Sequence, residues 1–147
     1  MRIRPFILER YFAKYEFNIR HLLSPSDCEA LSLAEVMSLA DAEGRALWRD
    51  LTLGYTESQG HPRLRAEIAG LYERVTPEGV VVAVPEEAIF VAMNTLLAPG
   101  DHVVTISPAY QSLYEIARAI GCEVTPWPVE VRDGRWAIDV AALPGLL

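Results

Sequence analysis

The feature that most constrains the fold is an alternation of short apolar runs and helix-forming segments that begins near residue 79. The apolar runs are VVVAV (80–84), HVVTI (102–106) and CEVTPWPVE (122–130), and their many β-branched residues are typical of strands in a sheet. Between them lie two segments of helical composition, PEEAIFVAMNTLL (85–97) and SPAYQSLYEIARAIG (107–121). This β-α-β-α-β order predicts an α/β fold with a parallel sheet.

Turn residues predict where these elements end. The triplet PGD (99–101) should close the first helix, and Gly121 should close the second. The pair DG (133–134) predicts a hairpin turn, and AALPGLL (141–147) should form a short helical turn. Two prolines in the third strand predict that it lies at an edge of the sheet, since proline donates no ladder hydrogen bond.

The residues before this region are helical in pattern. ILERYFAKYEF (7–17) has apolar and aromatic residues at helical spacing. Ser32 and Glu35 have the spacing of a capping box, in which each side chain accepts a hydrogen bond from the other residue's backbone. We expect the helix that they open to run to Gly44, because glycine is a favourable terminator.

A polar loop, LTLGYTESQG (51–60), follows these helices, and Pro62 then opens a further helix. Loops framed by glycine stand on the surface and often carry function. We therefore divide the chain into an N-terminal helical arm with this loop, residues 1–60, and part of a larger α/β domain, residues 61–147.

Composition excludes several classes of function. The 147 residues carry a formal net charge of -7, which argues against nucleic-acid binding because such binding needs a basic surface. No apolar run is long enough to span a bilayer, and the N-terminus does not resemble a signal peptide. The two cysteines fit a reduced, cytoplasmic protein, and neither they nor the three histidines have the spacing of metal ligands.

Three motifs follow one another along the chain: LGYTESQGHPRLRAEIAGLY (53–72), PEEAIFVAMNTLLAPGDHVV (85–104) and SPAYQSLYEIARAIGCEV (107–124). Together they resemble the class I/II aminotransferases, the fold-type I enzymes that use pyridoxal 5′-phosphate (PLP). The resemblance implies a truncated portion of the large, PLP-binding domain of that fold, preceded by N-terminal helices. It also implies PLP-dependent transfer of an amino group to or from an amino acid.

The resemblance assigns roles to four residues. Tyr110 matches the aromatic residue that stacks on the pyridine ring of PLP, and Tyr55 matches the tyrosine that reaches across a dimer interface to the cofactor phosphate. Glu86 and Glu87 occupy the helix N-terminus that normally cradles that phosphate. The sequence departs from the family pattern at this point, since Pro85 has no amide hydrogen and Glu86 adds negative charge.

From the residues alone, plainer roles for these side chains stay open. Tyr110 could fill a core, and Tyr55 could be a turn or interface residue. Glu86 and Glu87 could simply stabilise the first turn of their helix, by about 0.3–1 kcal/mol each.

The chain contains one lysine, Lys14, against twelve arginines. In the family a lysine forms the Schiff base with PLP, but Lys14 lies in the N-terminal helix and does not match that position. We therefore expect no catalytic residue among these positions and no transamination by this chain alone. The alternative is a truncated, non-catalytic dimerisation or binding module that kept the core of the fold.

The resemblance also bears on strand pairing. In the family the strands that match 80–84 and 102–106 are not neighbours, because later strands lie between them. Unpaired edges of buried strands are costly. We therefore expect these strands either to pair with each other or to borrow partners through a homodimer, with strand swapping as one route.

Overall fold

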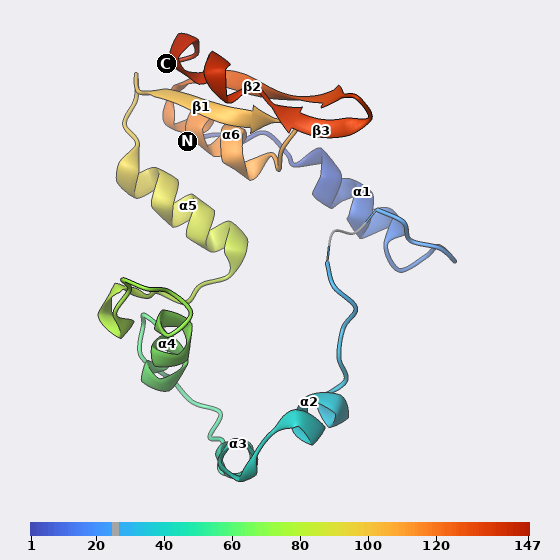
Figure 1. The fold of residues 1–147 in the computed structure, drawn as a ribbon, viewed down its shortest axis with the longest axis vertical. Coiled ribbons are helices and arrows are strands. Elements are labelled where there is room, and N and C mark those ends of the chain that lie inside the picture. Colours follow the sequence, from blue (N-terminus) through green and yellow to red (C-terminus); the bar gives the residue numbers. More distant parts are fainter. Residues whose placement is uncertain (25–26) are drawn as a thin grey trace. The chain divides into compact units, whose positions relative to one another are not determined.

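The computed structural model describes residues 1–24 and 27–147 (Figure 1). Its α-helices are α1 (Ile7–Tyr15), α2 (Leu33–Leu39), α3 (Ala42–Arg49), α4 (Pro62–Ala69), α5 (Pro85–Leu96) and α6 (Ser112–Ile120). Two 3₁₀ turns are η1 (Pro77–Gly79) and η2 (Val140–Gly145). The strands are β1 (His102–Ser107), β2 (Glu123–Arg132) and β3 (Arg135–Ile138).

The chain forms two compact units. The first unit joins Met1–Asn18 to Ala83–Leu147, and the second unit is Ile19–Val82. The first unit therefore contains the whole sheet, with α1, α5 and α6. The domain boundary expected at residue 60 falls inside the second unit and stays a prediction.

The sheet of the first unit has the order β1-β2-β3 (Figure 1). β1 and β2 run parallel, with a register from His102 opposite Glu123 to Ser107 opposite Pro128. The segment β1–α6–β2 is thus a parallel β-α-β unit, which confirms the predicted α/β fold.

Helix α6 supplies most of the buried core of the first unit. Ile116 is 3% exposed and Ala117 is fully buried. Burial of an isoleucine side chain contributes about 1.5–3 kcal/mol, which fixes this face of the helix against its neighbours. The helix ends at Gly121, whose φ of +107° is a left-handed conformation that other residues rarely adopt. Gly121 therefore closes the helix, as predicted.

The hairpin between β2 and β3 is also as predicted. Asp133 and Gly134 both have positive φ, 53° and 73°, which is the geometry of the turn that matches the twist of two antiparallel strands. The predicted edge position of the third strand is correct only in part. Its proline-containing residues, 123–128, pair with β1 alone, whereas residues 129–132 pair with β3, so β2 is the middle strand.

The predicted strand at 80–84 is wrong. These residues form no ladder with any strand among residues 1–24 and 27–147, and the backbone N–H of Val82 instead donates to the carbonyl of Gln59 at 2.9 Å. Val81 and Val84 are both 66% exposed, so the segment is not buried on both faces either. The segment is apolar, but a strand also requires a neighbouring strand with which its backbone can form hydrogen bonds. The expected pairing of 80–84 with 102–106 is therefore wrong, and borrowing of strands in a dimer stays a prediction.

The second unit confirms the capping box of α2. The backbone N–H of Ser32 donates to the Glu35 carboxylate at 2.7 Å, and the Ser32 hydroxyl accepts from the Glu35 N–H at 3.3 Å. The helix does not run to Gly44, however, and ends at Leu39. The reason is a competing cap, since the Asp41 carboxylate accepts from the Gly44 N–H at 2.7 Å and opens α3.

Arg65 holds α4 of the second unit against the turn that follows it. Its guanidinium donates to the carbonyl oxygens of Pro77 and Val80 at 2.6–3.0 Å. Two guanidinium nitrogens thus make three hydrogen bonds to two backbone carbonyls at and just after η1.

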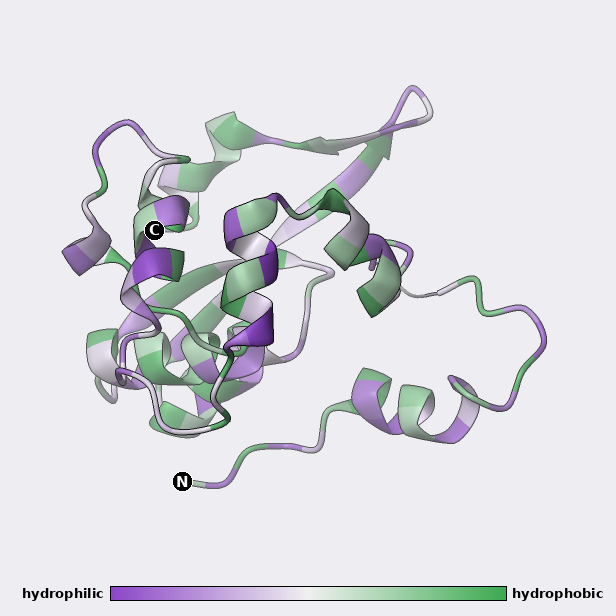
Figure 2. Cartoon of the chain, turned by 90° about the horizontal axis from the view of Figure 1, so that it is seen from below, coloured by the Kyte–Doolittle hydropathy of each residue, from purple (hydrophilic) through white to green (hydrophobic). Residues whose placement is uncertain are grey.

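The helices carry apolar and polar residues together, and Figure 2 shows the two kinds alternating around them. Within the described ranges, no helix is both long and apolar enough to cross a membrane.

Substituting Ser32 by alanine should raise the pKa of Glu35 toward its usual value, because the hydroxyl is lost while the backbone N–H remains. The side-chain and backbone hydrogen bonds from Ser32 lower the pKa of Glu35 below its usual value. A carboxyl with a lowered pKa stabilises the fold above the pKa of the unfolded chain, and that contribution is lost as the pH falls through the folded pKa. NMR titration should give a higher Glu35 pKa in S32A and an unchanged one in the control S58A. An equal pKa in S32A and wild type would contradict the capping box.

Candidate functional site

The site that the sequence points to lies at the junction between β1 and α6. β1 ends at Ser107 and α6 begins at Ser112, so a short loop that contains Tyr110 joins the carboxyl end of a parallel strand to a helix N-terminus. Ligands of open α/β sheets bind at this kind of edge. Tyr110 is 49% exposed, so its ring does not fill the core of the described chain and has surface available to a ligand.

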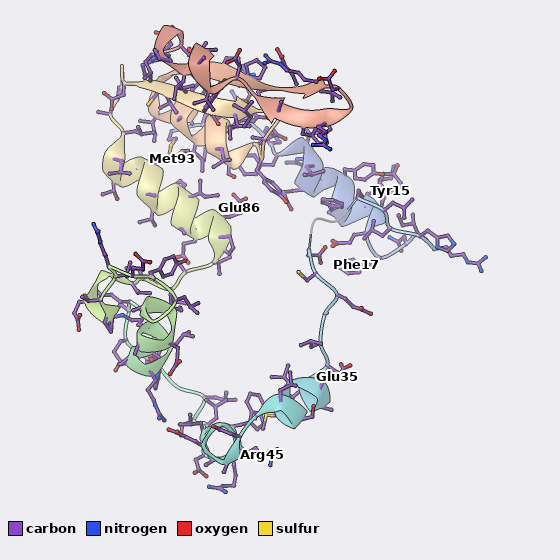
Figure 3. The ribbon with its side chains drawn as sticks, viewed as in Figure 1. Tyr15, Phe17, Glu35, Arg45, Glu86 and Met93 are labelled. Carbon is purple, nitrogen blue, oxygen red and sulfur yellow. The ribbon has the colours of Figure 1, made fainter. Side chains whose placement is uncertain are left out.

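The N-terminus of α5 meets this junction through a partly buried hydrogen bond. The Ser112 hydroxyl donates to the Glu86 carboxylate at 3.2 Å, and Ser112 is 1% exposed. Figure 3 shows Glu86 at the N-terminal end of α5. The structure therefore places Glu86, at the start of α5, beside Ser112, which follows Tyr110 by two residues in the chain.

The first turn of α5 offers few donors to an anion. Pro85 stands at the first helical position and has no N–H, as predicted, and the Ala88 N–H is bonded to the Val84 carbonyl. The amides of Glu86 and Glu87 have no acceptor among the described residues. These two amides suit a phosphate oxygen, whereas the two carboxylates beside them oppose its charge. The residues present thus fit the ring of PLP better than they fit its phosphate.

The arginines near the junction are engaged by a buried carboxylate. Glu115 is 5% exposed and pairs with Arg118 at 2.9 Å and with Arg4 at 3.9 Å. This arrangement neutralises Glu115 within the first unit. Both guanidinium groups are therefore paired with this carboxylate.

Lys14 lies in the last turn of α1, with its ammonium 4.8 Å from the centroid of the Tyr15 ring, a cation–π contact (Figure 3 labels Tyr15). The start of α1 touches the junction, since the Ile7 N–H donates to the side chain of Gln111. Lys14 follows Ile7 by seven residues, which is about 10 Å along a helix. Lys14 therefore lies about two turns along α1 from the residue that contacts Gln111, and the expectation that this chain has no catalytic lysine stays a prediction.

Tyr55 belongs to the second unit and is fully exposed. It lines a hollow of about 940 Å³ together with apolar side chains of the second unit, among them Leu47, Leu51, Leu53 and Leu64. The role expected for Tyr55 at the cofactor phosphate stays a prediction.

Sequence reasoning missed Gln111, Ser112 and Glu115. A signal existed for the last two, since positions 112, 115 and 116 share one face of a helix and Ile116 marks that face as buried. No local signal existed for Gln111, because its partners, Pro5 and Ile7, are more than 100 residues away. No group of three metal-binding side chains gathers anywhere in the described ranges.

Comparison with known proteins places this geometry in a family. The model for aminotransferase class I and II matches residues 23–147. The chain belongs to the class I and II aminotransferase family. This finding confirms the resemblance that the three motifs indicate.

The chain spans less than half the length of each of the three similar proteins that follow, although the matched segments make up most of this chain. Capreomycidine synthase of Streptomyces vinaceus is 40% identical over 92 residues, which are 61% of this chain and 23% of that protein. A PLP-dependent aminotransferase structure from Streptococcus suis 89-1591 superposes with a TM-score of 0.86 at 27% identity, over 100% of this chain and 40% of its own. The PLP-dependent cyclase OrfR superposes with a TM-score of 0.81 at 31% identity, over 99% of this chain and 38% of its own. The chain therefore has part of the PLP-dependent transferase fold, as predicted.

Substituting Ser112 by alanine should destabilise the first unit. The change leaves the Glu86 carboxylate without its buried donor, and loss of one such hydrogen bond costs about 1 kcal/mol. The free energy of unfolding from urea denaturation measures the loss, with S58A in an exposed loop as the matched control. Equal stability of S112A and S58A would show that the contact does not hold α5 to α6.

Proposed function

We propose that this chain contributes the cofactor-stacking part of a PLP-dependent enzyme that transfers amino groups to or from amino acids. The observation that carries the proposal is the half-exposed ring of Tyr110 at the carboxyl end of β1, beside the helix start of α5. Family membership supports it, because the class I and II aminotransferase model covers this junction.

Tyr110 would hold the flat ring of the cofactor, since offset stacking of two aromatic rings contributes about 0.5–1.5 kcal/mol beyond the buried area. The amides of Glu86 and Glu87 would donate to its phosphate. The Glu86 carboxylate accepts from Ser112, and this contact directs it toward α6. These residues bind and orient; none of them is placed to move a proton on a substrate.

When bound, PLP provides an electron sink that allows an amino acid to exchange its amino group. A lysine beside the ring is needed for that chemistry, and Lys14 is engaged with Tyr15 in α1. The proposal therefore assigns binding of the cofactor ring, and not the lysine chemistry, to these 147 residues. The amino-acid substrate is proposed from the family, which includes structures named as an aminotransferase and as a cyclase.

Binding of 4′-deoxypyridoxine 5′-phosphate tests this proposal. This compound has the ring and phosphate of PLP but no aldehyde, so it cannot react with Lys14 or with the terminal amine. Calorimetry should detect binding by the wild-type chain, a loss of roughly threefold or more in Y110A, and near wild-type binding in Y110F, because a phenyl ring stacks as well. Y72A, on an exposed tyrosine of the second unit, should bind as the wild type does. Equal binding by Y110A and Y72A would refute the stacking role.

A second candidate is the non-catalytic dimerisation or binding module. The exposed leucines and Tyr55 around the hollow of the second unit favour it, because solvent-facing apolar clusters commonly mark protein interfaces. The two candidates are compatible if a homodimer brings Tyr55 of one copy to the cofactor of the other. A cytoplasmic location is part of the same proposal, and both cysteines, Cys28 and Cys122, are free.

Light scattering after size exclusion tests the homodimer. We expect a dimer for the wild type, and weaker self-association in L53D, which adds a charge to an apolar side chain that is 95% exposed. The matched control L23D alters another side chain that is 94% exposed, outside the residues that line the hollow. A monomeric wild-type chain at all concentrations would rule out a homodimer of this chain.

A further inference from the structure

Gln111 makes an unusual pair of contacts at the junction. It occupies the N-cap position of α6, yet its side chain makes no hydrogen bond to that helix. Its carboxamide oxygen accepts from the N–H of Ile7, and its carboxamide nitrogen donates to the carbonyl of Pro5 at 3.5 Å. One side chain therefore binds both a donor and an acceptor of the N-terminal segment, Arg4–Ile7.

These contacts provide hydrogen-bond partners for the start of α1 rather than for α6. Ile7 is the first residue of α1, and Phe6 at its N-cap position provides no side-chain cap. The first amides of a helix have no partner within the helix. Gln111 supplies one from 104 residues away, and the Arg4–Glu115 ion pair lies one helical turn further along α6.

Gln111 also follows Tyr110 directly in the sequence. The backbone of Gln111 is held at one side by the start of α6, where the Tyr114 and Glu115 amides donate to its carbonyl at 3.2 and 2.8 Å. Its side chain is held by the N-terminal segment. The residue thus fixes the end of the loop that presents the Tyr110 ring.

We propose that Gln111 is a positioning residue that caps α1 and couples the order of the N-terminal segment to the placement of Tyr110. The part that concerns cofactor binding rests on the proposed function; the coupling between α1 and the loop does not. Release of the N-terminal segment should make the loop of residues 108–111 more mobile. The Tyr110 ring, on which we propose that a planar phosphorylated ring stacks, should then be less well held.

Changing the partner rather than Gln111 gives the sharpest test. In I7P the N–H that Gln111 accepts is absent, while proline suits the first position of a helix and Phe6 is already extended. I7A is the matched control, because it loses the same exposed side chain but keeps the N–H. Hydrogen exchange should be roughly fivefold or more faster at the amides of Ala109–Ser112 in I7P than in I7A. Equal exchange in the two variants would overturn the coupling.

Two variants at Gln111 separate hydrogen bonding from packing. Q111M keeps the length of the side chain and loses both contacts, so exchange of the Ile7 amide should accelerate by a similar factor. Q111E keeps the acceptor for that amide, and negative charge is favourable at a helix N-terminus, so it should restore most of the protection. Q59M, at the other glutamine of the chain, should leave exchange at Ile7 unchanged. Equal exchange in Q111M and Q59M would contradict the capping role.

The cofactor analogue provides the functional readout. We expect I7P to bind 4′-deoxypyridoxine 5′-phosphate roughly threefold or more weakly than I7A does. If the wild-type chain binds the analogue and I7P binds it as tightly as I7A does, the link from Gln111 to the Tyr110 ring is wrong and the proposed function stands. If the wild-type chain binds no analogue, cofactor binding by this chain fails, and exchange alone decides the coupling.

Discussion

The parallel ladder between β1 and β2 fixes where the side chains of the candidate site can lie. A parallel pair requires a crossover, and α6 makes it, held down by Ile116 and Ala117. The crossover must begin at the carboxyl end of β1. Residues 108–111 are therefore confined to the sheet edge at which α/β proteins bind ligands, whatever their own preferences.

Three consecutive residues at that edge have different surroundings. Tyr110 presents a half-exposed ring, Gln111 turns to the start of α1, and Ser112 turns inward to Glu86 of α5. Because neighbouring residues share a backbone, we propose that the contacts of Gln111 also help to place Tyr110. This linkage explains how a loop on the surface can hold a ring in one place without burying it.

The sequence allowed prediction of features with local causes. The hairpin at 133–134, the end of α6 at Gly121 and the capping box of Ser32 each depend on residues a few positions apart. The failures have non-local or competing causes. Residues 80–84 have the composition of a strand, but pairing depends on what lies alongside. Gly44 can end a helix, but Asp41 starts one first.

The same reasoning limits what this part of the fold can do by itself. In the proposed role, a stacked ring and two amide donors would lower the free energy of a bound cofactor equally before and during a reaction, and such uniform binding does not accelerate chemistry. Acceleration needs a group that acts at the reacting carbon, and the proposed role of this junction includes no such group. The residues at this junction are therefore suited to hold and orient a ring for chemistry performed by other groups. For such a role the rigidity of the loop that carries Tyr110 matters more than the acidity of any side chain near it.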